Sequence, residues 1–401
     1  MDVPNVSDES SRRYLFLRHQ LMRILLVTYE YPPVGAGGAR AGQGIAKSLT
    51  ELGHRVVVLT SGFKGLPSRC EDKGIIIYRV ASRRARIDRS DTIEKSSFLA
   101  AGLMFVPTII RAHQVEGAIV FFSIPGGPIG LLGRWLCGVP YIISLRGGDV
   151  PGAEPGLNFV HRLLRPLRRT ILKNSIAIVA NSNGLQKMSE TADPFPVEVI
   201  PNGVDTEFFI PAQSKPARNE SVLRILFVGR FQRQKNIPFL LGQVAQLSPE
   251  TFELHLVGDG PEKQVLEELA RKLRIASAAT WHGWLPAAEL LHVYQSLDCL
   301  VNPSLYEGMS NVVLEAMACG LPIIASRVPG NEELVLDGET GFLFHLGEPA
   351  TLLSALAQLR DPNLRRRMGI LARNRAMNFF SWNNAAGQYA ELFSTALPSA
   401  K

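Results

Sequence analysis

The sequence predicts an α/β fold with two domains, each built on a doubly wound parallel sheet. A buried strand, a glycine-rich loop, a helix and a second buried strand follow one another near the start of the chain. The same alternation restarts after a polar stretch in the middle. Strands that alternate with helices form parallel sheets, because each helix carries the chain back to the start of the next strand. A length of 401 residues suffices for two hydrophobic cores.

The first half opens with an expected strand at 23–28, an apolar run typical of a strand that is buried on both faces. A loop rich in glycine and proline spans 31–38, and a helix with apolar residues every three to four positions follows it. With the next expected strand at 56–60, these elements form a βαβ unit. Further strands are expected at 75–80, 118–122, 141–145, 177–180 and 197–200.

The second half restarts the pattern after the polar residues 211–221, with a strand at 224–228, a helix and a strand at 253–257. Two more strands are expected at 299–302 and 322–325. Two such arrays joined by a hinge predict two Rossmann-like domains that face a cleft. The expected division is an extension at 1–21, a first domain at 22–205 completed by the final helix at 380–397, a linker at 206–221 and a second domain at 222–379.

Composition excludes a disordered chain, because 46% of the residues are hydrophobic and 20% are charged. The four cysteines are scattered without a CxxC pair, which indicates a reducing compartment and argues against a structural zinc site. Residues 1–21 lack the apolar core of a signal peptide, and no uninterrupted apolar run reaches the ~18 residues of a membrane span. We therefore expect a cytoplasmic protein without a metal.

Positive charge is concentrated in the first half. Residues 1–205 carry a formal charge of +8 and the remainder −1, against +7 for the whole chain. Arginines with helical spacing lie in 159–173, and a second arginine cluster lies in 83–89. Such a surface attracts an anionic membrane or a phosphorylated substrate, and the alternative is an ordinary helix with one solvated face. Nucleic acid is not expected as a partner, because aromatic residues are not interleaved with the charges.

Two carboxylates eight positions apart, Glu307 and Glu315, flank the start of an apolar run that predicts a buried helix. Ser310 or Asn311 suits the N-cap, so Glu307 precedes the helix and Glu315 lies about one turn inside it. The free N–H groups of a helix N-terminus attract phosphate, and a carboxylate beside them suits hydroxyl groups. The pattern favours a sugar phosphate or a nucleotide; the alternative is two glutamates without a shared task.

Three cations, Arg230, Arg233 and Lys235, fall within six residues after the strand that opens the second domain. Open α/β sheets bind ligands at the carboxyl ends of such strands. Arginine and lysine donors suit a diphosphate, and the alternative is a solvated basic loop. Gly258 follows the next strand on the same edge. The opening glycine loop lacks the dinucleotide fingerprint, because Arg40 stands in the place of its third glycine.

Seven stretches occur in a specific order and spacing. They are Pro32-Pro33 with Gly37-Gly38, 53–56 (GHRV), 200–205 (IPNGVD), Gly229-Arg230 with Lys235, 258–261 (GDGP), the glutamate pair with 320–322 (GLP), and 337–343 (DGETGFL). Together they resemble the retaining nucleotide-sugar glycosyltransferases of glycosyltransferase family 4, which have the GT-B fold. The resemblance runs from about Met22 to the last helix.

The resemblance implies three catalytic residues. Arg230 and Lys235 would hold the donor diphosphate and stabilise the leaving group, and Glu307 would lie close to the transferred sugar. It also implies a donor-binding set, in which Glu315 binds the ribose hydroxyls: Gly37, Gly38, Gly229, Gly258, Gly308, Met309, Ser310, Asn311 and Glu315. The donor would be a UDP- or GDP-linked sugar, the anomeric configuration would be retained, and neither a metal nor a further cofactor would be needed.

One position departs from the family pattern. Many members carry a histidine in a His-Gly-x-Asp stretch after a strand of the first domain, where this chain has Arg146 followed by Gly147, Gly148 and Asp149. No general base carries over to this position. We expect Arg146 and Asp149 in the first-domain cleft, where Arg146 contacts the sugar, the phosphates or an anionic acceptor. An ion pair between Arg146 and Asp149 is the alternative.

The leading hypothesis is transfer of a hexosyl or N-acetylhexosaminyl unit to a polyprenyl-diphosphate-linked glycan or glycolipid acceptor in surface polysaccharide biosynthesis. In this family the first domain receives the acceptor, so a basic first domain would hold the enzyme peripherally on the inner face of the cell membrane. One alternative is an enzyme that makes a soluble glycoside or a sugar-phosphate conjugate. Another is a nucleotide-sugar-binding protein that has lost catalysis.

Overall fold

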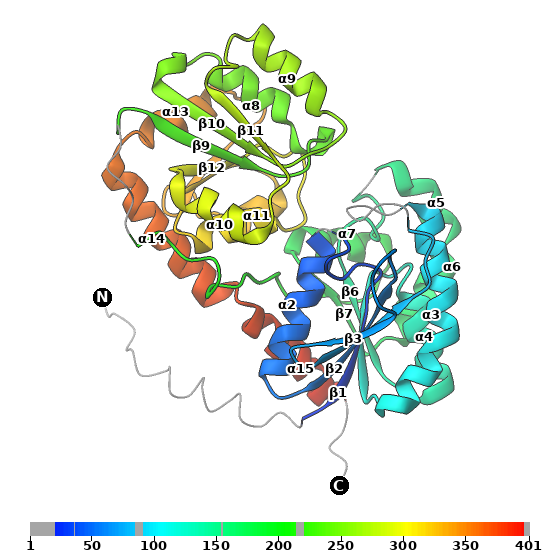
Figure 1. The fold of residues 1–401 in the computed structure, drawn as a ribbon. Helices are drawn as coiled ribbons and strands as arrows, with labels where there is room; N and C mark the ends of the chain where they lie inside the picture. Colours follow the sequence, from blue (N-terminus) through cyan, green and yellow to red (C-terminus); the bar gives the residue numbers. More distant parts are fainter. Residues whose placement is uncertain (1–20, 36, 85–90, 154, 214–219, 397–401) are drawn as a thin grey trace. The chain divides into compact units, whose positions relative to one another are not determined.

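The computed structural model describes residues 21–35, 37–84, 91–153, 155–213 and 220–396 (Figure 1). Residues 1–20 of the expected extension and 214–219 of the expected linker lie outside these ranges. The chain divides into two compact units, and each is treated by itself. Unit 1 comprises Met1–Asn181, Leu185–Ile200 and Trp382–Lys401, and unit 2 comprises Ser182–Gly184 and Pro201–Ser381.

Unit 1 contains an eight-stranded sheet in the order β3-β4-β2-β1-β5-β6-β7-β8. All neighbours pair in parallel except β3, which runs antiparallel to β4. The chain winds outward in both directions from β1, because β2 and β5 lie on either side of it. The strands are β1 Arg23–Val27, β2 Arg55–Ser61, β3 Arg69–Asp72, β4 Ile75–Val80, β5 Gly117–Phe121, β6 Tyr141–Leu145, β7 Ala177–Ala180 and β8 Glu198–Val199.

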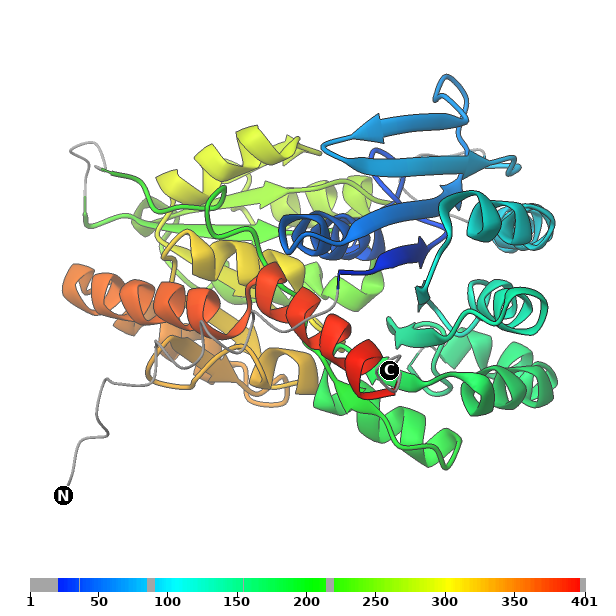
Figure 2. The same ribbon diagram turned by 90° about the horizontal axis from the view of Figure 1, so that it is seen from below.

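Helices cover both faces of this sheet, which explains why its central strands are apolar at every position. Alternate residues of a strand point to opposite faces. Thus Ile24 and Leu26 pack with α2 and α15, whereas Leu25 and Val27 pack with α3, α4 and α6. Figure 2 shows α3 and α4 together on one side of the sheet. The helices are α2 Gly37–Glu51, α3 Thr92–His113, α4 Gly127–Cys137, α5 Asn158–Leu163, α6 Arg165–Asn174, α7 Asn183–Ala192 and α15 Trp382–Ala396.

Helix α3 is the one described helix that is long and apolar enough, by length and composition, to cross a membrane. About a third of its apolar window is buried inside unit 1. Phe98, Val106 and Ile109 pack in the core that α3 shares with α4. The helix begins with a capping box, in which Asp91 accepts from the backbone N–H of Glu94 and Glu94 accepts from that of Asp91. Core packing thus accounts for its buried face.

Unit 2 contains a six-stranded, wholly parallel sheet in the order β11-β10-β9-β12-β13-β14. Here the strand order reverses at β9, which lies between β10 and β12. The strands are β9 Leu223–Val228, β10 Phe252–Val257, β11 Ala279–Gly283, β12 Cys299–Asn302, β13 Ile323–Ser326 and β14 Gly341–Phe344. The helices are α8 Ile237–Val244, α9 Lys263–Lys272, α10 Ala287–Ser296, α11 Asn311–Ala318, α12 Pro329–Glu332, α13 Ala350–Gln358 and α14 Pro362–Phe379.

The prediction of two α/β domains with doubly wound parallel sheets is confirmed. Three strands were not predicted. β3 has the sequence RCED, with a single partly buried residue, and β11 (ATWHG) has no fully buried residue. β14 is four residues long and directly follows a turn. β3 and β11 bury little apolar surface and leave little pattern in the sequence, whereas the edge strand β8 falls within the expected strand at 197–200.

Gly44 lies where α2 packs against α15. A Cβ at this position would be 2.4 Å from the indole of Trp382, although the glycine sits in a helix that alanine would otherwise favour. We expect Gly44→Ala to destabilise unit 1 by about 1–3 kcal/mol through overpacking. Gly242 in α8 has open space around it, so Gly242→Ala should stabilise unit 2 by roughly 0.5–1 kcal/mol. Calorimetry measures the melting temperature of both variants. An unchanged melting temperature for Gly44→Ala would contradict the close contact between α2 and Trp382.

Candidate functional site

The candidate site lies in unit 2, where the strand order reverses between β9 and β12. These strands are neighbours, with Cys299 opposite Ile225, so the loops after their carboxyl ends leave the same edge side by side. Two hydrogen bonds join the loops. The N–H of Leu305 donates to the carbonyl of Gln234 (2.8 Å), and Nε2 of Gln234 donates to the carbonyl of Tyr306 (2.9 Å). Residues 72 positions apart in the sequence are thereby fixed to each other.

Lys235 and Glu307 form an ion pair across these two loops. Their side chains are 14% and 7% exposed, so the pair is largely removed from water. The hydroxyl of Ser304 lies 2.7 Å from Oε1 of Glu307 and donates to it. Arg230 is half-buried in the same loop as Lys235. The structure therefore brings two of the three expected catalytic residues together and places the third beside them on the same sheet edge.

Two glycines of the expected donor-binding set let neighbouring backbones touch. A Cβ on Gly258 would lie 1.9 Å from the carbonyl oxygen of Gly229, and Gly258 has a positive φ of 137°. The N–H of Phe231 also donates to the carbonyl of Asp259 (3.0 Å). A side chain at Gly258 would push the loop of Arg230 away from its neighbour. The close approach of these backbones accounts for Gly258, and the positive φ of 156° accounts for Gly229; donor binding by either glycine stays a prediction.

Helix α11 begins at the end of the Glu307 loop, with Ser310 as its N-cap residue and Asn311 as its first residue. The amide groups of the first turn have no acceptor within the helix, and they lie at the positive end of its dipole. Asn202 holds this helix end in place: its Nδ2 donates to Oδ1 of Asn311 (3.0 Å), and its N–H points at Sδ of Met309 (3.0 Å). The IPNGVD stretch thus supports the helix N-terminus, a role that its turn chemistry did not indicate.

Glu315 lies inside α11 and is 4% exposed. Its Oε2 accepts a hydrogen bond from the hydroxyl of Tyr294 (3.0 Å), which is fully buried in α10. Burial, reinforced by the neighbouring Glu315, raises the pKa of the Cys319 thiol. Sequence reasoning missed Tyr294, because a tyrosine in an apolar helix has the same pattern whether or not its hydroxyl meets a carboxylate. Ribose binding by Glu315 stays a prediction.

The expected donor-binding glycines of unit 1 lie at the start of α2. Gly37 is the first residue of the helix, and a Cβ on Gly38 would lie 3.3 Å from the ring of Phe122 and 3.4 Å from a carboxylate oxygen of Glu30. Phe122 follows β5 with a positive φ of 67°, an uncommon conformation for a bulky residue. Gly38 therefore leaves space for the side chains of Phe122 and Glu30, at the point where the strand order of unit 1 reverses.

Arg146 follows β6, and its side chain meets residues of two other elements of unit 1. Its guanidinium lies 3.8 Å from the ring centre of Phe121 and donates to the hydroxyl of Tyr389 (3.3 Å). The carboxylate of Asp149 accepts from the backbone N–H groups of Ser123, Arg146 and Gly147 (2.8–3.1 Å). Burial raises the pKa of the Asp149 carboxyl, and these backbone bonds act against that rise. Asp149 therefore fixes the loop that carries Arg146.

One arginine of the basic stretch is buried: the side chain of Arg168 is 5% exposed, whereas those of Arg165 and Arg169 are 52% and 43% exposed. In α6, the guanidinium groups of Arg165, Arg168 and Arg169 converge on Asp193, whose side chain is 2% exposed. In the second arginine cluster, Arg84 is buried beside Glu30, with 3.6 Å between the charged groups. Arg86 and Arg89 lie outside the described residues.

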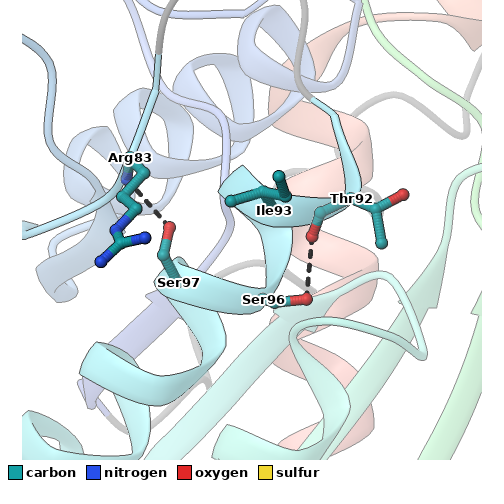
Figure 3. A pocket seen from close by; sticks show the side chains of 5 residues that line it. All are labelled: Arg83, Thr92, Ile93, Ser96 and Ser97. Atoms are coloured by element: carbon teal, nitrogen blue, oxygen red, sulfur yellow. Dashed lines mark hydrogen bonds between the residues drawn. The ribbon is translucent and has the colours of Figure 1, made fainter.

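The neighbouring Arg83 lines an open hollow of about 360 Å³ at the start of α3, together with Thr92, Ile93, Ser96 and Ser97 (Figure 3). The N–H of Arg83 donates to Oγ of Ser97 (2.9 Å), and Oγ of Ser96 donates to the carbonyl of Thr92 (2.8 Å). Both hydroxyls are thus occupied within the protein, and the hollow contains none of the expected site residues.

The chain belongs to the glycosyltransferases of family 4, and both halves match. Residues 36–208 match the model described as Glycosyltransferase Family 4, and residues 223–361 match that described as Glycosyl transferases group 1. An alpha-maltose-1-phosphate synthase of Mycolicibacterium smegmatis is 28% identical over 93% of this chain and 99% of its own length. A D-inositol 3-phosphate glycosyltransferase of Acidothermus cellulolyticus is 30% identical over 68% of this chain and 65% of its own length.

A similar solved structure is that of Anabaena Alr3699/HepE in complex with UDP and glucose. Its TM-score is 0.74 and its identity 20%, over 93% of this chain and 100% of that one.

The resemblance to this family and to the GT-B fold is therefore confirmed. The prediction of a polyprenyl-diphosphate-linked glycan or glycolipid acceptor in surface polysaccharide biosynthesis is wrong, because these relatives are named for maltose 1-phosphate and inositol 3-phosphate. The physical reason for the error lies in the basic stretch. The stretch predicts a free surface for anionic lipid, whereas Arg168 is buried and Arg165 and Arg169, although about half exposed, pair with Asp193 of the same unit.

Removing the hydroxyl of Tyr294 leaves the buried Glu315 carboxylate without that donor. We expect Tyr294→Phe to lower the free energy of unfolding by about 1–3 kcal/mol, as for other buried groups that lose a partner. Tyr78→Phe is the matched control, because the Tyr78 hydroxyl bonds to His113 in a half-buried position (2.8 Å) and its loss should cost less. Urea unfolding measures both variants. Equal costs would show that the Tyr294–Glu315 bond has no special weight.

Proposed function

We propose that the protein is a retaining glycosyltransferase that moves a hexosyl or N-acetylhexosaminyl unit from a UDP- or GDP-sugar to a small soluble acceptor. The product would be a soluble glycoside or a sugar-phosphate conjugate. The observation that carries this proposal is the ion pair of Lys235 and Glu307 at the carboxyl edge of β9 and β12, with Arg230 in the same loop. The pair combines a cation for phosphate with a carboxylate for sugar hydroxyls.

The chemistry of donor cleavage supports these roles. Departure of a nucleoside diphosphate builds negative charge on the phosphate oxygens, and fixed cations stabilise that charge more in the transition state than before it. An ammonium group has three N–H donors, so Lys235 can bond to Glu307 and still donate to a phosphate. The amide groups at the start of α11 add a second donor set for an anion. The UDP in the similar Anabaena structure supports a nucleoside diphosphate as the leaving group.

A small soluble acceptor is favoured by the relatives, whose names specify maltose 1-phosphate and inositol 3-phosphate. A cytoplasmic enzyme fits four cysteines that are all free thiols. Peripheral attachment to a membrane stays a prediction, and the carboxylate of Asp193 offsets one of the positive charges that the α6 arginines carry. An enzyme is favoured over a binding protein without catalysis, because the matched relatives are named as enzymes.

Binding of a nucleoside diphosphate should raise the melting temperature. A ligand at 100 times its Kd stabilises the folded state by about 2.7 kcal/mol. We expect UDP or GDP to produce this shift in the native protein and Lys235→Ala to reduce it strongly. Lys272→Ala is the matched control, because Lys272 is an exposed lysine at the end of α9. The absence of a shift with every nucleoside diphosphate and nucleotide sugar would contradict the proposed donor class.

Glu307→Gln should lower kcat by about 10²–10³-fold, because it removes the charge that the site directs at the reacting sugar. Bound donor should still raise the melting temperature of this variant, which separates catalysis from folding.

Turnover by the wild-type enzyme should proceed in vesicle-free buffer, and chelators should not change its rate. Wild-type turnover that requires lipid vesicles, or a Glu307→Gln variant with normal kcat, would contradict the proposal.

A further inference from the structure

The side chain of Asn302 bonds to both ends of the loop that carries Glu307. Asn302 is the last residue of β12 and is 2% exposed. Its Oδ1 lies 2.8 Å from Oγ of Ser304, three residues before Glu307. Its Nδ2 points at Oγ of Ser310, three residues after Glu307 (3.4 Å). One buried amide thus spans the loop from its start to the N-cap of α11.

The orientation of that amide is set by Asn331 in α12. Nδ2 of Asn331 donates to the carbonyl oxygen of Ser326 (3.0 Å), and a carbonyl oxygen can only accept. Oδ1 of Asn331 must therefore face Asn302, whose Nδ2 donates to it (3.1 Å). The Oδ1 of Asn302 is left to face Ser304. The carbonyl oxygen of Ser326 can only accept, so the amides of Asn331 and Asn302 each have a single orientation that is consistent with these hydrogen bonds.

Ser304 is the last link in this chain. Its hydroxyl has one proton and two acceptors within reach, Oδ1 of Asn302 at 2.8 Å and Oε1 of Glu307 at 2.7 Å. A hydrogen bond to a carboxylate is stronger than one to an amide oxygen. The single proton is therefore shared between the two oxygens as a three-centre hydrogen bond whose stronger component goes to Glu307, so Oγ of Ser304 is held by both residues. Ser326 holds the backbone of the same residue, because its hydroxyl donates to the carbonyl of Ser304 (2.6 Å).

The backbone of α12 also touches the Glu307 loop. A Cβ on Gly330 would lie 2.4 Å from the carbonyl oxygen of Gly308 and 2.6 Å from that of Glu307. Gly330 precedes Asn331, so the segment that carries the network is packed directly against the backbone of the candidate catalytic residue. A hydrogen-bond chain and a van der Waals contact join the same two segments. Asn302, Ser304, Ser326 and Asn331 are all at most 2% exposed.

We propose that Asn331 and Asn302 are positioning residues for the transfer reaction, acting through Ser304 to hold the Glu307 carboxylate beside Lys235. The inference rests on the proposed function, in which Glu307 lies beside the transferred sugar. Asn331 is fully buried and acts through the other members of the chain. Its effect on catalysis is large because a displacement of about 1 Å at a reacting group can cost about 10²-fold in rate.

A kinetic double-mutant cycle tests the proposal. We expect Asn331→Ala to lower kcat by about 10- to 100-fold while KM for the donor stays within about twofold. In a Glu307→Gln background the same change should have no further effect on kcat, because the residue it positions is already disabled. Ser304→Ala is the second variant and removes one oxygen atom from the same chain. Thr340→Val is the matched control, because Thr340 is equally buried and its hydroxyl accepts from Leu336 (2.8 Å) outside the network.

The outcomes are separable from those of the proposed function. If the wild type shows no transferase turnover, the proposed function fails and takes this inference with it. If the wild type turns over but Asn331→Ala and Ser304→Ala both keep its kcat, the positioning role is wrong. It is also wrong if Asn331→Ala lowers kcat by the same factor in the wild-type and Glu307→Gln backgrounds. If Asn331→Ala does not fold, Ser304→Ala decides by the same cycle, with the thermal shift by UDP or GDP as the check on folding.

Discussion

The ion pair of Lys235 and Glu307 is the interaction on which the rest of the site depends. A largely buried charge pair is costly unless its remaining donors and acceptors are satisfied, and removal of one partner leaves an uncompensated charge. Here the carboxylate is also held by Ser304, and the two loops are joined by hydrogen bonds of the backbone and the side chain of Gln234. The pair can exist only because β9 and β12 are neighbours in the sheet, which is a consequence of the point at which the strand order reverses.

Close backbone approach is the second constraint. The loop of Arg230 is seated against Gly258, and the loop of Glu307 is seated against Gly330. A Cβ at either glycine would come within 2.4 Å of a neighbouring carbonyl oxygen, so a side chain there would separate loops that have to converge. The glycines of this unit therefore act on the site through packing. The rigidity that they allow is what catalysis by fixed charges requires, because cations that are already in place need no rearrangement during the reaction.

The fold and the main residues of the site could be predicted because their signals are local. Buried strands are apolar runs, and the cations of 230–235 and Glu307 come directly after two of them. The partners of these residues could not be predicted, because their signals are not local. Tyr294, Asn331 and Tyr389 are ordinary helix residues in the sequence, and only the packing of helices against the sheet shows which polar groups they meet.

The acceptor was predicted wrongly for a related reason. Spacing gives the face of a helix on which arginines lie, and it does not show what covers that face. In α6 the arginines share one internal partner, the buried carboxylate of Asp193, which lies more than twenty residues farther along the chain. An excess of positive charge in a sequence therefore indicates an anionic partner only after the carboxylates of the same protein that pair with those arginines have been subtracted. Unit 1 still carries Arg146 on an aromatic ring at its own carboxyl edge.

The most direct measurement of the central claim is a crystal structure of the protein with a nucleoside diphosphate bound. The account predicts that the diphosphate lies at the carboxyl edge of β9 and β12, with Nζ of Lys235 and the guanidinium of Arg230 about 2.7–3.2 Å from phosphate oxygens. It also predicts that the Glu307 carboxylate keeps its contact with Ser304. A diphosphate bound away from Arg230 and Lys235, with the Lys235–Glu307 pair undisturbed, would contradict it.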